Sequence, residues 1–234
     1  MGTAMKTAGL IGGTSWESTI PYYRIINEAV RERMGGLHSA KIVLYSLEFG
    51  ELEKYQSAGD WDSVTDMVAL AAYSLEMAGA DFVMICSNTL HKVAPVLQKL
   101  ISVPVLHIGD TLTDALRQAG IKRAALLGTE LTMGESFYKE RLERAGIEVL
   151  TPEGDDAQIV DSVVFRELCM GIVSDKAKSE YLRIIDGLVE KGAQGVILGC
   201  TEMGMLLKAQ DTDVPIFDTA AIHAQKAAEL MFES

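Results

Sequence analysis

The sequence repeats itself, because segments in its first half have counterparts in the second half at a nearly constant spacing of about half the chain. The matching segments are 8–13 and 124–129, 78–86 and 191–200, and 103–106 and 214–217. A repeat of this kind indicates an internal duplication. Any parallel α/β chain reuses short Gly-Ala-strand patterns, but that alternative does not predict a cysteine at the same place in both copies, where Cys86 and Cys200 stand.

Short apolar runs bounded by Gly or Pro alternate with longer segments of helical period, which is typical of parallel sheets covered by helices. The predicted strands are 6–11, 40–47, 81–86, 103–108, 123–127, 195–200 and 214–217. Helices are predicted at 18–34, 61–78, 111–119, 134–145 and 178–191. The expected fold class is therefore α/β, with two similar parallel-sheet domains related by duplication.

The duplication also predicts how the domains are arranged. We expect a first α/β domain of residues 5–112 plus 215–234 and a second α/β domain of residues 113–214, with the active site in the cleft between them. Residues 1–4 precede a second methionine, Met5, that opens a strand-like run, so these four residues are excluded from the prediction. In both halves the cysteine ends a predicted strand, which is where open α/β sheets bind ligands.

The composition excludes several kinds of partner. The net charge is −12, the pI is near 4.8 and no cluster of Lys and Arg suits a phosphate backbone, so nucleic acid is not an expected partner. No apolar run approaches the roughly 18 residues that span a bilayer, and no signal peptide opens the chain, which predicts a cytoplasmic protein with no membrane partner. Cysteines without Cys-x-x-Cys spacing and scattered histidines predict neither a disulfide framework nor a metal site.

Two thiols at matching positions suit a reaction that inverts a carbon centre. Such a reaction removes a proton from one face of the carbon and returns a proton to the opposite face, so an acid and a base must flank it. Cysteine serves in either role, because helix N-termini and nearby donors lower its pKa from about 8.5 toward neutral pH. We therefore predict that Cys86 and Cys200 form a catalytic pair that uses no cofactor.

Polar residues that follow the predicted strands are candidates for substrate binding, because hydroxyl, amide and backbone N–H groups can hold a carboxylate and stabilise developing negative charge. Ser87, Asn88, Thr89, Thr201 and Glu202 adjoin the cysteines in the chain, and His91 is a possible tuning residue. Thr14 and Thr129 follow the first strand of each half and are further candidates for substrate contact. Ordinary structural roles stay open for several of them. Asn88, Thr89 and Thr201 equally suit helix caps, and His91 equally suits a buried structural histidine.

The motifs around the two cysteines resemble those of the aspartate/glutamate racemase family over essentially the whole chain. The matching motifs are Gly-Gly-Thr-Ser-Trp-Glu-Ser-Thr at 12–19, Cys-Ser-Asn-Thr-Leu-His at 86–91, Gly-Cys-Thr-Glu at 199–202 and Phe-Asp-Thr-Ala-Ala-Ile-His at 217–223. The resemblance implies a homodimeric, pyridoxal-independent racemase that interconverts the L and D forms of aspartate or glutamate. It also implies that Cys86 and Cys200 are the two acid/base residues.

One departure from the family concerns the side chain of the substrate. Aspartate-specific members carry an Arg and a Lys for the side-chain carboxylate, and the resemblance aligns Gln56 and Cys169 with them. Lys54 and Arg166 lie close by in sequence and are the alternative source of these cations. A neutral pocket admits uncharged side chains more readily than a charged pocket does, so the chain is similar to broad-specificity members. Gln56 thus becomes a candidate substrate-binding residue. Cys169 becomes a possible specificity residue, although its apolar neighbours favour a small buried hydrophobic side chain.

Other functions fit the same scaffold. A hydantoin racemase, a maleate isomerase or a malonate decarboxylase of the same superfamily also combines a duplicated fold with at least one cysteine. A non-catalytic protein that binds a small molecule is an alternative from a different class. Isotope exchange at the α-carbon of an amino acid separates the leading hypothesis from all of these.

Overall fold

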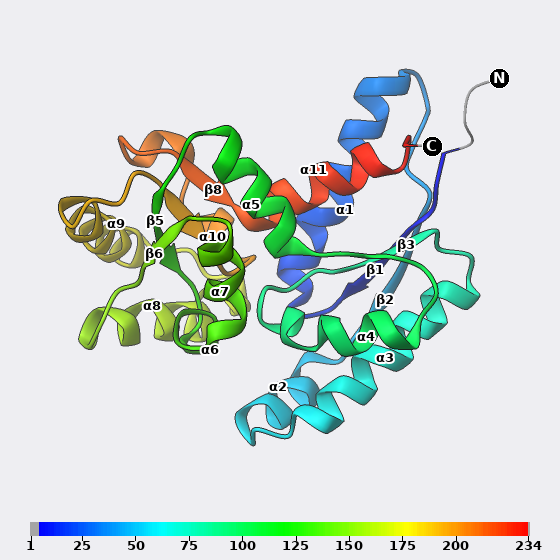
Figure 1. The fold of residues 1–234 in the computed structure, drawn as a ribbon, viewed down its shortest axis with the longest axis horizontal. Coiled ribbons are helices and arrows are strands. Elements are labelled where there is room, and N and C mark those ends of the chain that lie inside the picture. The colour runs from blue at the N-terminus through cyan, green and yellow to red at the C-terminus, as the bar shows by residue number, and fades with distance from the viewer. Residues whose placement is uncertain (1–4, 234) are drawn as a thin grey trace. The chain divides into compact units, whose positions relative to one another are not determined.

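The computed structural model describes residues 5–233, without the side chains of residues 136–138. Residues 1–4, which the sequence prediction excluded, lie outside this description. The chain divides into two compact units, and Figure 1 labels the helices and strands of both. Unit 1 runs to Ile108 and resumes at His223, and unit 2 is Gly109–Ile222.

Unit 1 contains a four-stranded parallel sheet in the order β2-β1-β3-β4. Its strands are β1 (Ala8–Gly12), β2 (Ile42–Ser46), β3 (Phe82–Ile85) and β4 (Val105–Leu106). Its helices are α1 (Trp16–Met34), α2 (Phe49–Ser57), α3 (Trp61–Met77), η1 (Thr89–Val93), α4 (Ala94–Leu100) and most of α11 (Thr219–Leu230). Every residue of β1 and β3 is buried, because helices cover both faces of the sheet (Figure 1).

Unit 2 repeats this topology with the strand order β6-β5-β7-β8, again all parallel. Its strands are β5 (Arg123–Leu127), β6 (Glu148–Leu150), β7 (Val196–Leu198) and β8 (Ile216–Asp218). Its helices are most of α5 (Ile108–Gln118), then α6 (Glu130–Gly134), α7 (Ser136–Arg144), α8 (Asp155–Arg166), η2 (Leu168–Met170), α9 (Asp175–Glu190), α10 (Met203–Leu206) and η3 (Ala209–Asp211). The predicted α/β class and the internal duplication are confirmed.

Two details differ from the sequence prediction. The sequence division groups residues 215–222 with the first domain, whereas β8 pairs in parallel with β7 and stays in the second sheet. The helix predicted at 134–145 is α7, which begins at Ser136 because Glu135 has an extended backbone with ψ of 151°, and the short helix α6 before it was not predicted. Both details depend on packing within unit 2. The spacing of apolar residues in a short segment therefore does not predict them.

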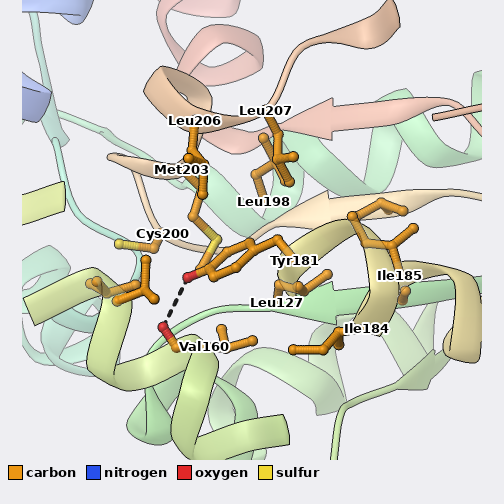
Figure 2. Packing of buried hydrophobic residues seen from close by; sticks show 14 of the residues in the cluster. Leu127, Val160, Tyr181, Ile184, Ile185, Leu198, Cys200, Met203, Leu206 and Leu207 are labelled. Carbon is orange, nitrogen blue, oxygen red and sulfur yellow. Dashed lines mark hydrogen bonds between the residues drawn. The ribbon is translucent and has the colours of Figure 1, made fainter. Parts of the chain in front are cut away.

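Buried apolar side chains from the sheet, α8 and α9 form the core of unit 2. Figure 2 shows Tyr181 of α9 within this core and Cys200 at the edge of the labelled group. The Tyr181 hydroxyl donates a hydrogen bond of 2.8 Å to the carbonyl oxygen of Val160, which gives a fully buried polar atom its partner. The core therefore reaches the cysteine that follows β7.

Membrane-spanning helices were sought among residues 5–233. None of the helices in that range combines the length and the apolar composition that crossing a bilayer requires.

Candidate active site

In unit 1, the loops that leave β1 and β3 bring Thr14 and Cys86 together. The two strands are hydrogen-bonded neighbours, and the N–H of Cys86 donates to the carbonyl oxygen of Ile11 at 2.8 Å. The Thr14 hydroxyl then donates to the carbonyl oxygen of Cys86 at 3.4 Å. Cys86 is fully buried, and this burial raises the pKa of its thiol.

Gly13 makes the approach of Thr14 possible. Its φ is +86°, in the left-handed region that favours glycine, and a Cβ atom there would collide with the backbone of Leu47. Gly13 is thus a backbone requirement of this turn.

The residues after Cys86 form a buried turn that leads into η1. Ser87 and Asn88 are buried and Thr89 is half-buried. The Ser87 hydroxyl accepts a long hydrogen bond of 3.5 Å from the N–H of Leu90. The turn therefore places three of the predicted substrate-binding residues next to Cys86 in the chain, and their roles toward a substrate stay predictions.

His91 bonds to backbone atoms through both ring nitrogens. Nε2 accepts from the N–H of Ile108 at 3.1 Å, so the ring proton is on Nδ1, which donates to the carbonyl oxygen of Ser87 at 2.6 Å. The side chain thereby ties the turn after Cys86 to the end of unit 1 at residue 108. This pattern is the structural role that the sequence left open for His91.

A second buried histidine is His223 of α11, the last residue of the matching motif at 217–223. Its Nε2 lies 2.9 Å from the carbonyl oxygen of Leu106 and its Nδ1 lies 3.2 Å from the Tyr22 hydroxyl, so Nε2 donates and Nδ1 accepts. Its ring centroid is 5.7 Å from that of His91. Burial, with a smaller contribution from His91, lowers the pKa of His223 to about 3.

In unit 2, the carboxylate of Glu202 accepts hydrogen bonds from the polar side chains that follow β7. The Cys200 thiol donates to Glu202 Oε2 at 2.8 Å, and the Thr201 hydroxyl donates to the same oxygen at 3.0 Å. All three residues are buried. Burial, and then the neighbouring Glu202 carboxylate, raise the pKa of the Cys200 thiol well above its usual value.

Gly199 lets the Cys200 strand end lie close to β5. Its N–H donates to the carbonyl oxygen of Leu127 at 2.6 Å, and a Cβ atom would lie 2.8 Å from that same oxygen. Real Cβ atoms do not approach a carbonyl so closely, so only glycine fits here. The close packing of β5 against this strand end thus requires the Gly of the Gly-Cys-Thr-Glu motif.

Cys169, on η2, is half-buried and lies against the same carboxylate. Its thiol donates to Glu202 Oε1 at 3.7 Å, on the oxygen that Cys200 does not use. Its apolar neighbours favoured a small buried hydrophobic side chain, whereas the structure places its sulfur beside a buried charge. Burial, followed by Glu202, raises the pKa of the Cys169 thiol.

Two further predicted substrate-binding residues are Thr129 and Gln56, and the structure shows the local contacts of Thr129 and the burial of Gln56. Thr129 is the N-cap of α6, and its hydroxyl oxygen accepts from the N–H of Thr132 at 3.3 Å. Gln56 is half-buried on α2. Within the described part of the chain, no group of three or more His, Cys, Asp or Glu residues is arranged to hold a metal ion.

Comparison with known proteins gives the family. The Asp/Glu/Hydantoin racemase family matches residues 11–227. A Yersinia pestis structure described as an Asp/Glu racemase is similar over 98% of this chain and all of its own, with 49% identity and a TM-score of 0.90. A structure of an aspartate racemase homologue from Pyrococcus horikoshii covers the same shares, with 36% identity and a TM-score of 0.86.

One curated protein with a similar sequence is also a racemase. The broad specificity amino-acid racemase RacX from Bacillus subtilis is 27% identical over 170 residues, which are 71% of each chain. The family match spans both units and both cysteine motifs. This chain therefore belongs to the Asp/Glu/Hydantoin racemase family.

Proposed function

We propose that this chain is a cofactor-independent amino-acid racemase in which Cys86 and Cys200 are the two acid/base residues. The observation that carries the proposal is the pair of thiols at matching strand ends in two units of identical topology. Membership of a racemase family supports the reaction class. The mechanism requires both sulfur atoms to reach one substrate carbon, from opposite faces.

In each half-reaction one cysteine, as thiolate, removes the α-proton, and the other, as thiol, delivers a proton to the opposite face. The negative charge that develops passes to the substrate carboxylate, which needs hydrogen-bond donors. Our candidates for these donors are Ser87 and Asn88, which follow Cys86 in the chain. Thr14 and Thr201 also adjoin the thiols, but each donates its single hydroxyl proton elsewhere, to the Cys86 carbonyl and to Glu202, and would have to turn to reach a substrate. After turnover the two cysteines have exchanged protonation states.

We further propose broad specificity that includes aspartate, glutamate and uncharged amino acids. Supporting it are the neutral side chains of Gln56 and Cys169 at positions where aspartate-specific members carry cations, and the similarity to a broad-specificity racemase. A substrate carboxylate near Cys200 would also approach the buried Glu202 carboxylate, which disfavours acidic side chains on that side.

The direct test incubates the purified protein with each pure enantiomer of the common amino acids in deuterated water. We expect α-deuterium to appear together with loss of optical purity for several amino acids. Inert amino acids, combined with turnover of maleate, malonate or a hydantoin, would reject the racemase assignment in favour of another superfamily activity. Binding without any turnover would favour a non-catalytic protein.

Single-cysteine variants test the two-base mechanism. We expect Cys86→Ser and Cys200→Ser each to lower racemisation by about 10³-fold, in the range that acid/base groups contribute. Each variant is expected to retain some exchange of the α-proton of one enantiomer, and the two variants should favour opposite enantiomers. Racemisation within about tenfold of the wild-type rate in either folded variant contradicts the mechanism.

We also propose a homodimer. Trp16, Ile20 and Tyr23, spaced four and three residues apart on one side of α1, are 60%, 45% and 55% exposed, so this side of the helix presents a row of large side chains that a second copy could cover. Sedimentation velocity of the wild type and of an Ile20→Glu, Tyr23→Glu variant measures this. A wild type that sediments as a monomer at micromolar concentration contradicts the proposal.

A further inference from the structure

Within residues 5–233 the chain passes between the two units at two places, and both places lie in helices. The chain leaves unit 1 after Ile108, the first residue of α5, and returns to unit 1 at His223, inside α11. Hydrogen bonds along a helix make each connection stiff, so the atoms that hold one point of it also orient the rest. Two buried histidines of unit 1 bond to the chain at these places.

His223 holds the returning chain to the departing chain. Its Nε2–H donates to the carbonyl oxygen of Leu106 at 2.9 Å, and its Nδ1 accepts from the Tyr22 hydroxyl at 3.2 Å. Leu106 belongs to β4, the strand at one edge of the sheet of unit 1, so a side chain can reach a carbonyl there. The bond therefore joins the two connections directly, inside unit 1.

His91 holds the departing chain to the turn after Cys86. Its Nε2 accepts from the N–H of Ile108 at 3.1 Å, and its Nδ1–H donates to the carbonyl oxygen of Ser87 at 2.6 Å. The first N–H groups of a helix have no acceptor within their own helix, and the N–H of Ile108 is one of these. The ring of His91 thus fixes the start of α5 to the residue that follows Cys86.

We propose that His91 and His223 form a tether of two neutral histidines that holds both connections between the units to the turn after Cys86, and that His91 is thereby a positioning residue for Cys86. The consequence for catalysis rests on the proposed function, because that function makes Cys86 one of the two bases. The tether itself is a property of unit 1 and requires no substrate.

Both rings must be neutral for the tether to exist, because each ring serves one donor and one acceptor. A backbone carbonyl only accepts and a backbone N–H only donates. A protonated His91 would present an N–H to the N–H of Ile108, and that bond would be lost. The two rings therefore carry their protons on different nitrogens, Nδ1 in His91 and Nε2 in His223.

The surroundings of the two rings favour this neutral state. His91 and His223 are both buried, and their ring centroids lie 5.7 Å apart. The titratable groups that face them are Tyr22 of α1, beside His223, and His107, whose ring centroid lies 4.4 Å from that of His91. Burial, with a smaller contribution from His91, lowers the pKa of His223 to about 3. His223 is therefore neutral at ordinary pH.

The proton positions can be measured in the unmodified protein. Long-range proton–nitrogen correlation spectra at neutral pH, assigned through the bonds of each side chain, report which ring nitrogen is protonated. We expect a neutral Nδ1–H form for His91 and a neutral Nε2–H form for His223. His38, at an exposed loop position, is the control and should show averaged signals typical of a free histidine. The same form in both buried rings, or a charged ring, overturns the tether.

A matched pair of variants separates the two bonds of His91. In His91→Gln the side-chain oxygen takes the place of Nε2 and still accepts from Ile108, whereas the bond to Ser87 is lost. In His91→Asn the amide nitrogen takes the place of Nδ1 and still donates to Ser87, whereas the bond to Ile108 is lost. We expect hydrogen exchange of the Ile108 amide to be about tenfold faster in His91→Asn and within about threefold of wild type in His91→Gln. Equal exchange in the two variants overturns the tether.

Cysteine labelling with methyl methanethiosulfonate tests the positioning of Cys86. His91→Gln frees the carbonyl of Ser87, so the buried Cys86 should be modified about tenfold faster than in wild type, because the turn opens more often. Cys200 of unit 2 should keep its rate to within about threefold, and His38→Gln should change neither rate. Peptide mass spectrometry reads the sites. An unchanged Cys86 rate, or equal increases at both cysteines from a general loss of stability, overturns the positioning role.

Variants of His223 test the link between the two connections. His223→Ala removes the bond to Leu106, whereas His223→Gln places an amide nitrogen where Nε2 stands and keeps a donor. We expect hydrogen exchange to rise about tenfold in both segments, 105–108 and 219–223, for His223→Ala and to stay within about threefold for His223→Gln. A rise confined to one of the two segments overturns the link.

None of these readouts uses an amino-acid substrate, so the two proposals fail separately. A protein that racemises nothing yet shows the two different ring forms and the selective labelling of Cys86 refutes the proposed function alone. A protein that racemises amino acids but shows one ring form in both histidines refutes the tether alone. The spectra need no substitution, so they decide the matter even where a variant at these buried sites does not fold.

Discussion

Cys86 and Cys200 occupy the same place in two units with the same strand order, yet their surroundings differ. Cys86 lies in a buried turn held by backbone atoms and by the Thr14 hydroxyl. Cys200 donates directly to a buried carboxylate, that of Glu202. A duplicated fold therefore fixed where the thiols stand, and single side chains nearby decided what each thiol can do with its proton.

The same contrast extends to the other titratable groups. All four histidines of the sequence belong to unit 1, where His91 and His223 lie buried. In unit 2 the buried titratable groups include Cys200, Glu202 and Tyr181, and Cys169 is half-buried. Unit 1 is thus expected to lose stability in acid through His223 and in alkali through Cys86, and unit 2 to lose stability in alkali through its thiols.

The largest predicted effect is a loss of stability above about pH 9. Burial keeps the Cys86 and Cys200 thiols protonated in the folded state above their ordinary value of 9.0, while the unfolded chain releases both protons. The free energy of unfolding should then fall by about 1.4 kcal/mol per thiol per pH unit, or about 3 kcal/mol for the two. The half-buried Cys169 thiol, whose pKa burial also raises, adds a smaller share. Urea unfolding at pH 8 to 10 measures this slope.

Serine variants show how much of the pH dependence of the free energy of unfolding comes from the thiol of each unit. Cys86→Ser and Cys200→Ser should each remove one thiol's share, and Cys200 should hold its proton to higher pH because Glu202 repels the thiolate. A slope that neither variant changes would show that the thiols do not cause it.

The second prediction concerns the strand end that carries Cys200. Gly199→Ala should lower the free energy of unfolding by about 3 kcal/mol, at the upper end of overpacking costs, because the atom it meets is a backbone carbonyl that cannot move aside. Gly187→Ala in α9 is the matched control. That site has open space, so alanine should stabilise by about 0.5–1 kcal/mol in the same urea measurement. Equal midpoints for both variants would remove the packing argument.

The third prediction concerns acid and unit 1. The unfolded chain protonates a histidine below about pH 6.5, whereas folded His223 takes up a proton only near pH 3, so stability is lost as pH falls through this window. The loss attributable to His223 should reach about 2 kcal/mol at pH 5. His223→Gln should flatten the pH dependence of the unfolding midpoint, and His38→Gln, at an exposed loop position, should not. The same flattening in both variants contradicts a role for burial.

Much of the fold follows from local patterns. The strand predicted at 123–127 has the observed bounds of β5, and the apolar runs at 81–86 and 195–200 contain β3 and β7. Such central strands are buried on both faces and therefore read as continuous apolar runs. β6 and α8 were not predicted, because a three-residue edge strand and a helix rich in β-branched residues carry weak local signals.

The candidate site divides in a similar way. Cys200, Thr201 and Glu202 are adjacent in sequence, so their proximity was readable from the motif. The bond between Cys169 and Glu202 was not, because it depends on how η2 packs beside α10. The sequence weighed Cys169 by its apolar neighbours and so favoured a hydrophobic role.

By itself the sequence determined the duplicated α/β architecture and the equivalent positions of the two cysteines, because strand burial and strand ends are properties of short segments. Only the tertiary structure decided which groups touch those segments. His223 reaches the carbonyl of Leu106 across 117 residues, and Cys169 reaches Glu202 across 33. Hydrogen bonds of this kind depend on the packing of distant elements to within an ångström or so, and no local pattern of residues encodes that distance.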